Sequence, residues 1–423
     1  MPNPKKTLKH FSSTIISLTN RHRELISNQL YNSIRFILTT LIALLTLKLI
    51  TTYLSPESYG KYKNVLAIVA LFSITTITGF NKSLGGYVVK NFHGTVKKST
   101  IISLKFGIIG VIGLIVFGFY SYIVLNETAF SILYFVAAAV FLPYTIFIRY
   151  GGILAGLQRF KELLFYGLTI KITLFLTAVV ILIVLNKDII TFGISQLTVS
   201  AFLYTLFYFI SSRKLKNDNV DQGYLKHSVT LSLIGLGSSI ISPGIQIYLN
   251  FALGSASLAY FIIAKSLSHQ ILAVVKPIVQ PLSIKLASKD RRNYNLAILK
   301  LSPFVIMFGI LLYLIYYLAI DNLGPYFISE AYQSSILYAK LLGAQIIISP
   351  LYSLLNSNIV FEKKNKVYSI SVYGNQLAVL IGYFLLVGEY GIFGVIITNV
   401  GSFIIQVIIM MYYLLKDIKK LKI

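Results

Sequence analysis

Four lysines lie deep within long apolar segments, and none has an acidic residue near it in the sequence. They are Lys171, Lys265, Lys276 and Lys340. All 13 acidic residues lie in connectors, in tails or at the ends of the apolar segments. Because a lysine facing lipid at the centre of a membrane helix costs about 2.5 to 3.5 kcal/mol, we expect these four to face water. A wet cavity lined by cations attracts an anion, so the four lysines are candidate substrate-binding residues.

Two of these lysines belong to one polar stripe. Lys265, His269, Lys276 and Gln280 follow one another at intervals of 4, 7 and 4 residues. At about 100° per residue, this spacing places them on one face of a helix. His269 alone could equally be a hydrogen-bonded packing residue. Its place between two lysines makes it a candidate for binding the same anion.

Other polar residues admit two interpretations. Gln246 and Asn250 continue a stripe on the preceding apolar segment, where such residues either bind a ligand or only hold helices together. Arg35 and Arg149 lie closer to segment ends, from which a long side chain can lift its charge to the membrane surface. We include all four among the candidate substrate-binding residues.

The composition predicts an all-α membrane protein that crosses the bilayer many times. Hydrophobic residues make up 56% of the 423 residues, the mean hydropathy is +0.77, and apolar runs of about 20 residues recur throughout. About twelve spans are expected, at 30–52, 64–86, 99–125, 129–152, 164–186, 190–211, 228–253, 257–284, 297–320, 332–360, 367–388 and 391–415.

Composition also limits the chemistry. The net charge of +25 comes from Lys and Arg in short connectors, where they orient a membrane protein, so no nucleic-acid partner is expected. The chain has no cysteine, and its five histidines lack the spacing of metal ligands. No nucleotide-binding glycine motif precedes a soluble helix. We therefore expect neither a metal, nor a cofactor, nor an enzymatic activity.

Basic residues concentrate in every second connector, which predicts cytoplasmic termini and an even number of spans. The longest polar break, SSRKLKNDNVDQGYLKH, falls between the sixth and seventh spans. Two six-helix bundles around a central cationic cavity are the natural arrangement. The expected parts are a basic cytoplasmic tail (1–29), a first bundle (30–211), a cytoplasmic linker (212–227), a second bundle (228–415) and a second basic tail (416–423).

Several motifs resemble those of a transporter family. LSPESYGKYKNVLAIVALFSITTITGFNKSLGGYVVK, starting at Leu54, resembles a turn and second helix of the polysaccharide transporter branch of the multidrug/oligosaccharidyl-lipid/polysaccharide exporter superfamily. GGILAGLQRFKELLFYGL resembles its fourth-to-fifth helix connector, GSASLAYFIIAKSLS its seventh-to-eighth connector, and GEYGIFGVIITNVGSFI its last hairpin. The order and spacing of these motifs together cover nearly the whole chain.

The resemblance implies a flippase of the O-antigen or capsule type in the bacterial plasma (inner) membrane. Its substrate would be an undecaprenyl-pyrophosphate-linked oligosaccharide, moved from the cytoplasmic to the outer leaflet by alternating access. Basic cavity residues would bind the pyrophosphate and acidic sugars. Further implied partners are membrane lipids, a polysaccharide polymerase and a chain-length regulator of lipopolysaccharide assembly. Where relatives often carry an acid or amide late in the seventh span, this chain has Gln246 and Tyr248.

Related functions remain open at this point. A teichoic acid, exopolysaccharide or peptidoglycan precursor would suit the same cavity, although peptidoglycan flippases usually have about fourteen helices. A multidrug or cation antiporter normally places an acid in its cavity, and no deep acid is visible here. A membrane-embedded glycan polymerase would need a sizeable loop or carboxylates, and the sequence offers neither.

Overall fold

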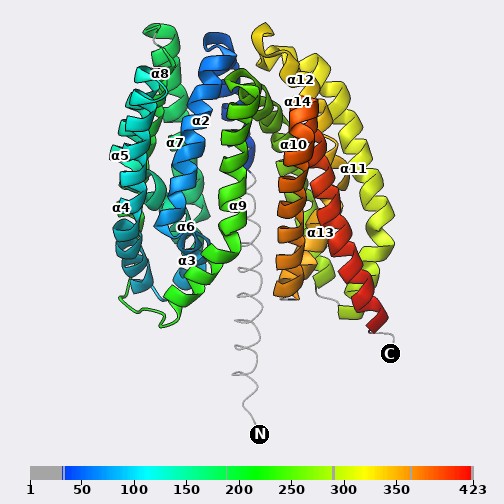
Figure 1. The fold of residues 1–423 in the computed structure, drawn as a ribbon. Coiled ribbons are helices and arrows are strands. Elements are labelled where there is room, and N and C mark those ends of the chain that lie inside the picture. The colour runs from blue at the N-terminus through cyan, green and yellow to red at the C-terminus, as the bar shows by residue number, and fades with distance from the viewer. Residues whose placement is uncertain (1–30, 32–33, 187, 288–290, 363, 421–423) are drawn as a thin grey trace.

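The computed structural model describes residues 31, 34–186, 188–287, 291–362 and 364–420, and it is helical throughout these ranges apart from turns (Figure 1). The first half contains a first helix (Ile34–Tyr53), α2 (Pro56–Phe72), η1 (Ser73–Thr76), α3 (Gly79–Val89), α4 (Gly94–Ile123), α5 (Thr128–Ile146), η2 (Phe147–Arg149), α6 (Tyr150–Gly156), α7 (Phe160–Val179), η3 (Val180–Val184) and α8 (Ile189–Ser212). The second half contains α9 (Tyr224–Leu253), α10 (Ser255–Ala287), α11 (Arg291–Phe327), η4 (Glu330–Tyr332), α12 (Ser334–Leu342), α13 (Gln345–Phe361) and α14 (Asn365–Lys420).

The described helices account for twelve spans. Nine segments are long and apolar enough to cross a membrane, and the bent pair of α2–η1 and α3 makes ten. The segment Lys366–Lys419 holds two spans, because Gly391 interrupts the helical backbone with φ 56° and ψ −131°. The 33-residue α10 is the twelfth. The prediction of an all-α protein with about twelve spans is confirmed.

The start of α2 corrects one boundary. The Ser55 hydroxyl accepts a hydrogen bond from the Ser58 amide at 3.3 Å, and Pro56 and Glu57 occupy the first turn. A capping serine, a first-turn proline and a first-turn acid each favour a helix start. The helix therefore begins at Pro56 rather than at 64, and Lys63 lies within it instead of in a connector.

The two halves meet at one end of the molecule, at the top of Figure 1. Tyr332 of η4 donates its hydroxyl hydrogen bond to the Leu54 carbonyl at 3.0 Å, and the Ser329 amide donates to the Thr51 hydroxyl at 3.3 Å. Gly60 of α2 lies directly against α10: a Cβ added there would fall 1.8 Å from the Ser255 carbonyl oxygen. Only glycine permits this close approach.

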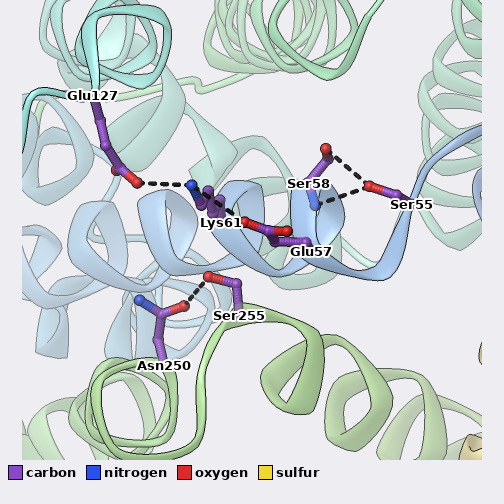
Figure 2. A network of polar contacts seen from close by, with 7 residues as sticks. All are labelled: Ser55, Glu57, Ser58, Lys61, Glu127, Asn250 and Ser255. Atoms are coloured by element: carbon purple, nitrogen blue, oxygen red, sulfur yellow. Dashed lines mark hydrogen bonds and ion pairs between the residues drawn. The ribbon is translucent and has the colours of Figure 1, made fainter.

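Figure 2 shows how the neighbouring polar groups hold this junction. The Ser255 hydroxyl donates to Asn250 Oδ1 at 2.7 Å, which joins the end of α9 to the start of α10. Lys61 Nζ lies 3.0 Å from Glu127 and 3.5 Å from Glu57, so it ties α2 to the α4–α5 connector. The junction thus combines the close contact of α2 with α10 and an ion pair that holds α2 to the rest of the first half.

The other end, at the bottom of Figure 1, is called here the basic end because its connectors and the helix turns beside them carry Lys90, Lys97, Lys98, Arg213 and Lys216. There α9 leans onto the first half. The Gly79 amide donates to the Ser232 hydroxyl at 2.8 Å, and the hydroxyls of Ser83 and Ser228 lie 2.9 Å apart. The halves are therefore linked at this end through α3 and α9.

The α8–α9 connector is held against the start of α4 at the same end. The Gly94 amide donates to the Asn219 carbonyl at 2.8 Å, and the Asp221 amide donates to the Thr95 hydroxyl at 3.1 Å. The Lys216 amide donates to His93 Nδ1 at 3.0 Å. The free backbone amides of the helix start and of the connector are thus satisfied by a carbonyl and by two side chains.

Replacing Gly60 with valine should weaken the junction between the halves, because the new side chain collides with the Ser255 carbonyl. We expect thiol cross-linking between Thr51→Cys and Ser329→Cys to fall about fivefold, the effect of roughly 1 kcal/mol. The chain has no native cysteine to interfere. Gly86→Val is the matched control, since a Cβ there meets nothing within 4 Å. Equal cross-linking in both variants would show that the Gly60 contact does not hold the halves together.

Candidate functional site

A polar pocket of about 190 Å³ lies inside the second half. Its walls come from α10, from the break between α12 and α13, and from both parts of α14. The lining residues are Lys265, Ser268, His269, Leu342, Gln345, Asn375, Val379, Asn399, Ser402 and Phe403. Lys265 and His269 lie one helical turn apart, so the predicted pairing of these two residues on one face is confirmed.

Helix breaks and mutual hydrogen bonds position the side-chain amides of this pocket. Gln345 begins α13 after the turn at Gly343 and Ala344, and its Nε2 donates to the Asn399 carbonyl at 3.0 Å. Asn399 Nδ2 donates to the Tyr383 hydroxyl at 2.7 Å. Asn375 Oδ1 is buried and has no hydrogen-bond partner among the described residues. The pocket therefore holds oriented polar groups with spare hydrogen-bonding capacity.

The charge of the pocket is positive. None of its lining residues is acidic, and the Lys265 ammonium makes no ion pair within the described ranges. Its near neighbour is the Phe261 ring, whose centroid lies 5.7 Å from Nζ. Such a site suits an anion that also accepts or donates hydrogen bonds, because a lysine charge and neutral amides have no competing carboxylate.

A second group of cations lies in the first half. Arg35 of the first helix packs along Gly167 of α7, where an added Cβ would lie 3.4 Å from Arg35 Cδ. Lys171 lies one helical turn after Gly167 and is exposed. Its positive charge lies near that of Lys63 of α2. Lys63 belongs to α2, which packs on α9 and α10 of the other half, so Lys171 lies near the helix that joins the two halves.

Tyrosines surround this group, and the sequence analysis missed them. Tyr204 lies between Tyr144 and Tyr150, with ring centroids 5.9 Å and 6.1 Å away. Tyr144 lies near Lys63, and Tyr150 lies near Arg35. The three hydroxyls make no hydrogen bond within the described part of the chain. The available signal was the large number of tyrosines, 30 in all, many of them inside apolar spans.

Arg149 does not belong to this group of cations. It is 2% exposed, and its Nε donates to Asn81 Oδ1 at 2.6 Å. Its Nη2 donates to the Ser103 hydroxyl at 2.6 Å and to the Thr76 carbonyl at 3.4 Å. Thr76 ends η1, where the chain turns before α3, so its carbonyl lacks a full helical partner. The expectation of a snorkelling or cavity-facing Arg149 is wrong, because this buried arginine donates its hydrogen bonds to groups beside the break between η1 and α3.

Lys340 is also not an unpaired cation. Its ammonium forms an ion pair with Asp321 of α11 and lies 4.4 Å from the centroid of the Tyr317 ring. The two partners are 19 residues apart in the sequence. They meet because α11 and α12 pack against each other. The expectation that Lys340 lacks an acidic neighbour is therefore wrong.

The remaining predicted residues are distributed as follows. Asn250 Oδ1 accepts the hydrogen bond from the Ser255 hydroxyl at the turn between α9 and α10, as described above. Gln246 is half-buried on α9 and makes no side-chain hydrogen bond within the described residues. The Lys276 and Gln280 side chains lie outside the described part of the structure. Across the described ranges, no group of three metal-ligating side chains occurs.

The chain resembles known proteins both in sequence and in fold. The family described as polysaccharide biosynthesis protein matches residues 25–286. No curated protein sequence matches the chain. An inward-facing multidrug resistance MATE family transporter of the MOP superfamily superimposes with a TM-score of 0.68 at 15% identity, covering 91% of this chain and 95% of that one.

Two further structures share the fold. The lipid II flippase MurJ in an inward closed conformation has a TM-score of 0.68 at 15% identity, covering 92% of this chain and 89% of that one. A MOP superfamily transporter from Pyrococcus furiosus, described as having a binding pocket of reversed polarity, has a TM-score of 0.63 at 14% identity. It covers 94% of this chain and 96% of that one. At these identities the likeness shows the fold.

Replacing Arg149 with alanine should destabilise the protein, because a buried side chain and its hydrogen bonds to Asn81 and Ser103 are lost, although the Thr76 carbonyl keeps its hydrogen bond from the Ser103 hydroxyl at 2.6 Å. We expect a total loss of about 1 to 3 kcal/mol in the free energy of unfolding, measured as a lower thermal unfolding temperature in detergent. Lys171→Ala, at an exposed cation without a described hydrogen bond, is the control and should unfold near the wild-type temperature. Equal unfolding temperatures for Arg149→Ala and the wild type would contradict the structural role.

Proposed function

Because the chain belongs to the polysaccharide biosynthesis protein family, we propose that it is a flippase for a lipid-linked oligosaccharide in the bacterial plasma membrane. The substrate is an undecaprenyl-pyrophosphate-linked repeat unit of the O-antigen or capsule type. The observation that carries this proposal is the acid-free pocket containing Lys265 and His269. The likeness to MurJ, named as a lipid II flippase, supports a lipid-linked substrate.

The chemistry of the head group fits the two cationic sites. A pyrophosphate diester carries about two negative charges, which need counter-charges inside a membrane protein. Lys265 provides a positive charge in the second half, where the His269 ring beside it offers a hydrogen bond, and Arg35, Lys63 and Lys171 provide positive charges in the first half. The neighbouring amides and tyrosine hydroxyls are suitable hydrogen-bond partners for sugar hydroxyl groups.

The arrangement of the halves supports alternating access. At the end opposite the basic end they are joined where α2 packs closely on α10, whereas at the basic end the contacts described above run through α3 and α9. The fold also matches a transporter described as inward-facing. We assign the basic end to the cytoplasm, where connectors rich in Lys and Arg are retained. In this state the head group enters from the cytoplasmic side, and opening of the Gly60–Ser255 junction releases it outside.

The direct test is deletion of the gene followed by mass analysis of lipid-linked sugars. Cells lacking the protein should accumulate a complete oligosaccharide unit on its lipid carrier. Lys171→Ala and Lys265→Ala should each lower export of the glycan about tenfold or more, the effect of losing one charge-assisted contact. Lys340→Ala, which removes a lysine already paired with Asp321, should export near normally. A deletion strain with no accumulated lipid-linked sugar would overturn the proposal.

Membrane potential should accelerate the movement of this anion. With the cytoplasm negative, outward movement of one negative charge releases about 2.3 kcal/mol per 100 mV. In proteoliposomes, a valinomycin-induced potential, negative on the side of the basic end, should therefore speed flipping. His269→Gln should keep this response. Flipping that follows only a pH gradient and stops in His269→Gln would instead show proton coupling through the histidine.

A further inference from the structure

An apolar groove of about 310 Å³ lies between α9 and the first part of α14. Ile240, Ile241, Gly244, Ile245 and Tyr248 line it from α9, and Leu380, Tyr383 and Phe384 line it from α14. Its volume is at the lower end of the range for small-molecule sites, about 300 Å³ and above. No residue of this groove belongs to the cationic sites described above.

The groove exists because the two helices touch at one point and separate beyond it. A Cβ added to Gly237 would lie 2.0 Å from Gln376 Oε1, and the Tyr373 hydroxyl donates to the Ile234 carbonyl at 3.4 Å. Further along, toward the end opposite the basic end, Gly244 leaves an open position. A Cβ there would meet nothing within 4 Å. The contact at Gly237 and the gap at Gly244 together form the groove.

The groove opens sideways, toward the hydrocarbon of the bilayer. Phe384 is 84% exposed, and Leu380 and Ile240 are about half exposed, at 49% and 46%. Such side chains on a membrane span face apolar surroundings. The groove is thus accessible to an apolar chain that lies within the membrane.

On its other side, the same part of α14 faces the polar pocket. Asn375 and Val379 line that pocket, whereas Leu380 and Phe384 line the groove. Tyr383 connects the two sites: it lines the groove, and its hydroxyl accepts the hydrogen bond from Asn399 of the pocket. An anion site and an apolar site therefore adjoin across one helix, which is the pairing that an amphipathic lipid requires.

We infer that the groove between α9 and α14 binds the polyprenyl tail of the substrate while its pyrophosphate head group occupies the pocket of Lys265 and His269. This inference rests on the proposed function and adds the route of the tail. The tail stays at the boundary with lipid, and only the head group and sugars enter the polar interior. Burial of tail methylene and methyl groups against Ile241, Ile245 and Tyr383 supplies the affinity.

The test uses Gly244→Leu, which fills the groove without a clash. Gly401→Leu is the matched control. A Cβ at Gly401 also meets nothing within 4 Å, and this position lies on the outward face of α14 with exposed Ile397, Ile404 and Ile408. Both changes place the same side chain on the same kind of surface, and only the first one occupies the groove.

Flipping is measured in proteoliposomes with one disaccharide on two carriers, undecaprenyl pyrophosphate and the short neryl pyrophosphate. We expect Gly244→Leu to slow the long-tailed substrate about tenfold and to change the short-tailed one less than about twofold. Gly401→Leu should affect neither. Equal slowing of both substrates, or of neither, would overturn the groove assignment while leaving the flippase proposal intact. A wild-type protein that moves neither substrate would overturn both.

A second measurement distinguishes the substrate tail from ordinary membrane lipid. A photo-crosslinking benzoylphenylalanine at Phe384 is exposed to vesicles containing undecaprenyl phosphate and a hundredfold excess of phosphatidylglycerol. Adducts should be mainly polyprenyl, and Gly244→Leu should remove them. Adducts in proportion to the lipid mixture would show that the groove is filled by bulk lipid, and would overturn the inference.

Discussion

A lysine or arginine inside a bilayer must find a counter-charge, a set of hydrogen-bond acceptors or water, because hydrocarbon offers none of these. The cations of the chain meet this constraint in different ways. Lys340 has Asp321, and Arg149 has the oxygens of Asn81, Ser103 and Thr76. Lys171 and Lys265 have neither kind of partner in the described structure. In the function proposed above, the pyrophosphate of the substrate is the partner of these two cations.

The same constraint explains why helix breaks gather where polar groups do. A break frees carbonyl and amide groups, which need partners as much as a charge does. The Thr76 carbonyl at the end of η1 accepts hydrogen bonds from Ser103 and Arg149, and the turn at Gly343 places Gln345 beside Asn399. Each broken span thus creates a polar position inside an apolar bundle. A straight helix would offer only its side chains.

Much of the fold could be predicted from hydropathy and charge alone. The number of spans and the helical pairing of Lys265 with His269 depend on local periodicity, which a sequence displays directly. The start of α2 was missed although Ser55, Pro56 and Glu57 signal it, because a hydropathy window averages over a polar first turn. The capping signal and the apolar run have to be considered together to place such a boundary.

The predictions for Lys340 and Arg149 were wrong for another reason. Whether Lys340 has a partner depends on how α11 and α12 pack, and whether Arg149 is buried depends on contacts from three different elements. Neither is encoded in residue spacing. The groove on α14 is hidden in the same way, since its other wall is more than 100 residues distant along the chain. Local patterns identify polar residues inside spans, and only tertiary packing decides which of them are free.

The path of α9 has a consequence for how the molecule is assembled. By sequence α9 opens the second half, yet toward the basic end its Ser228 and Ser232 contact α3, and beyond its far end Ser255 contacts Gly60. The α8–α9 connector adds backbone hydrogen bonds to the start of α4. The covalent link is therefore only one of several ties between the halves. A chain divided within that connector would yield two polypeptides with complementary surfaces, able to reassociate in the membrane as a split protein.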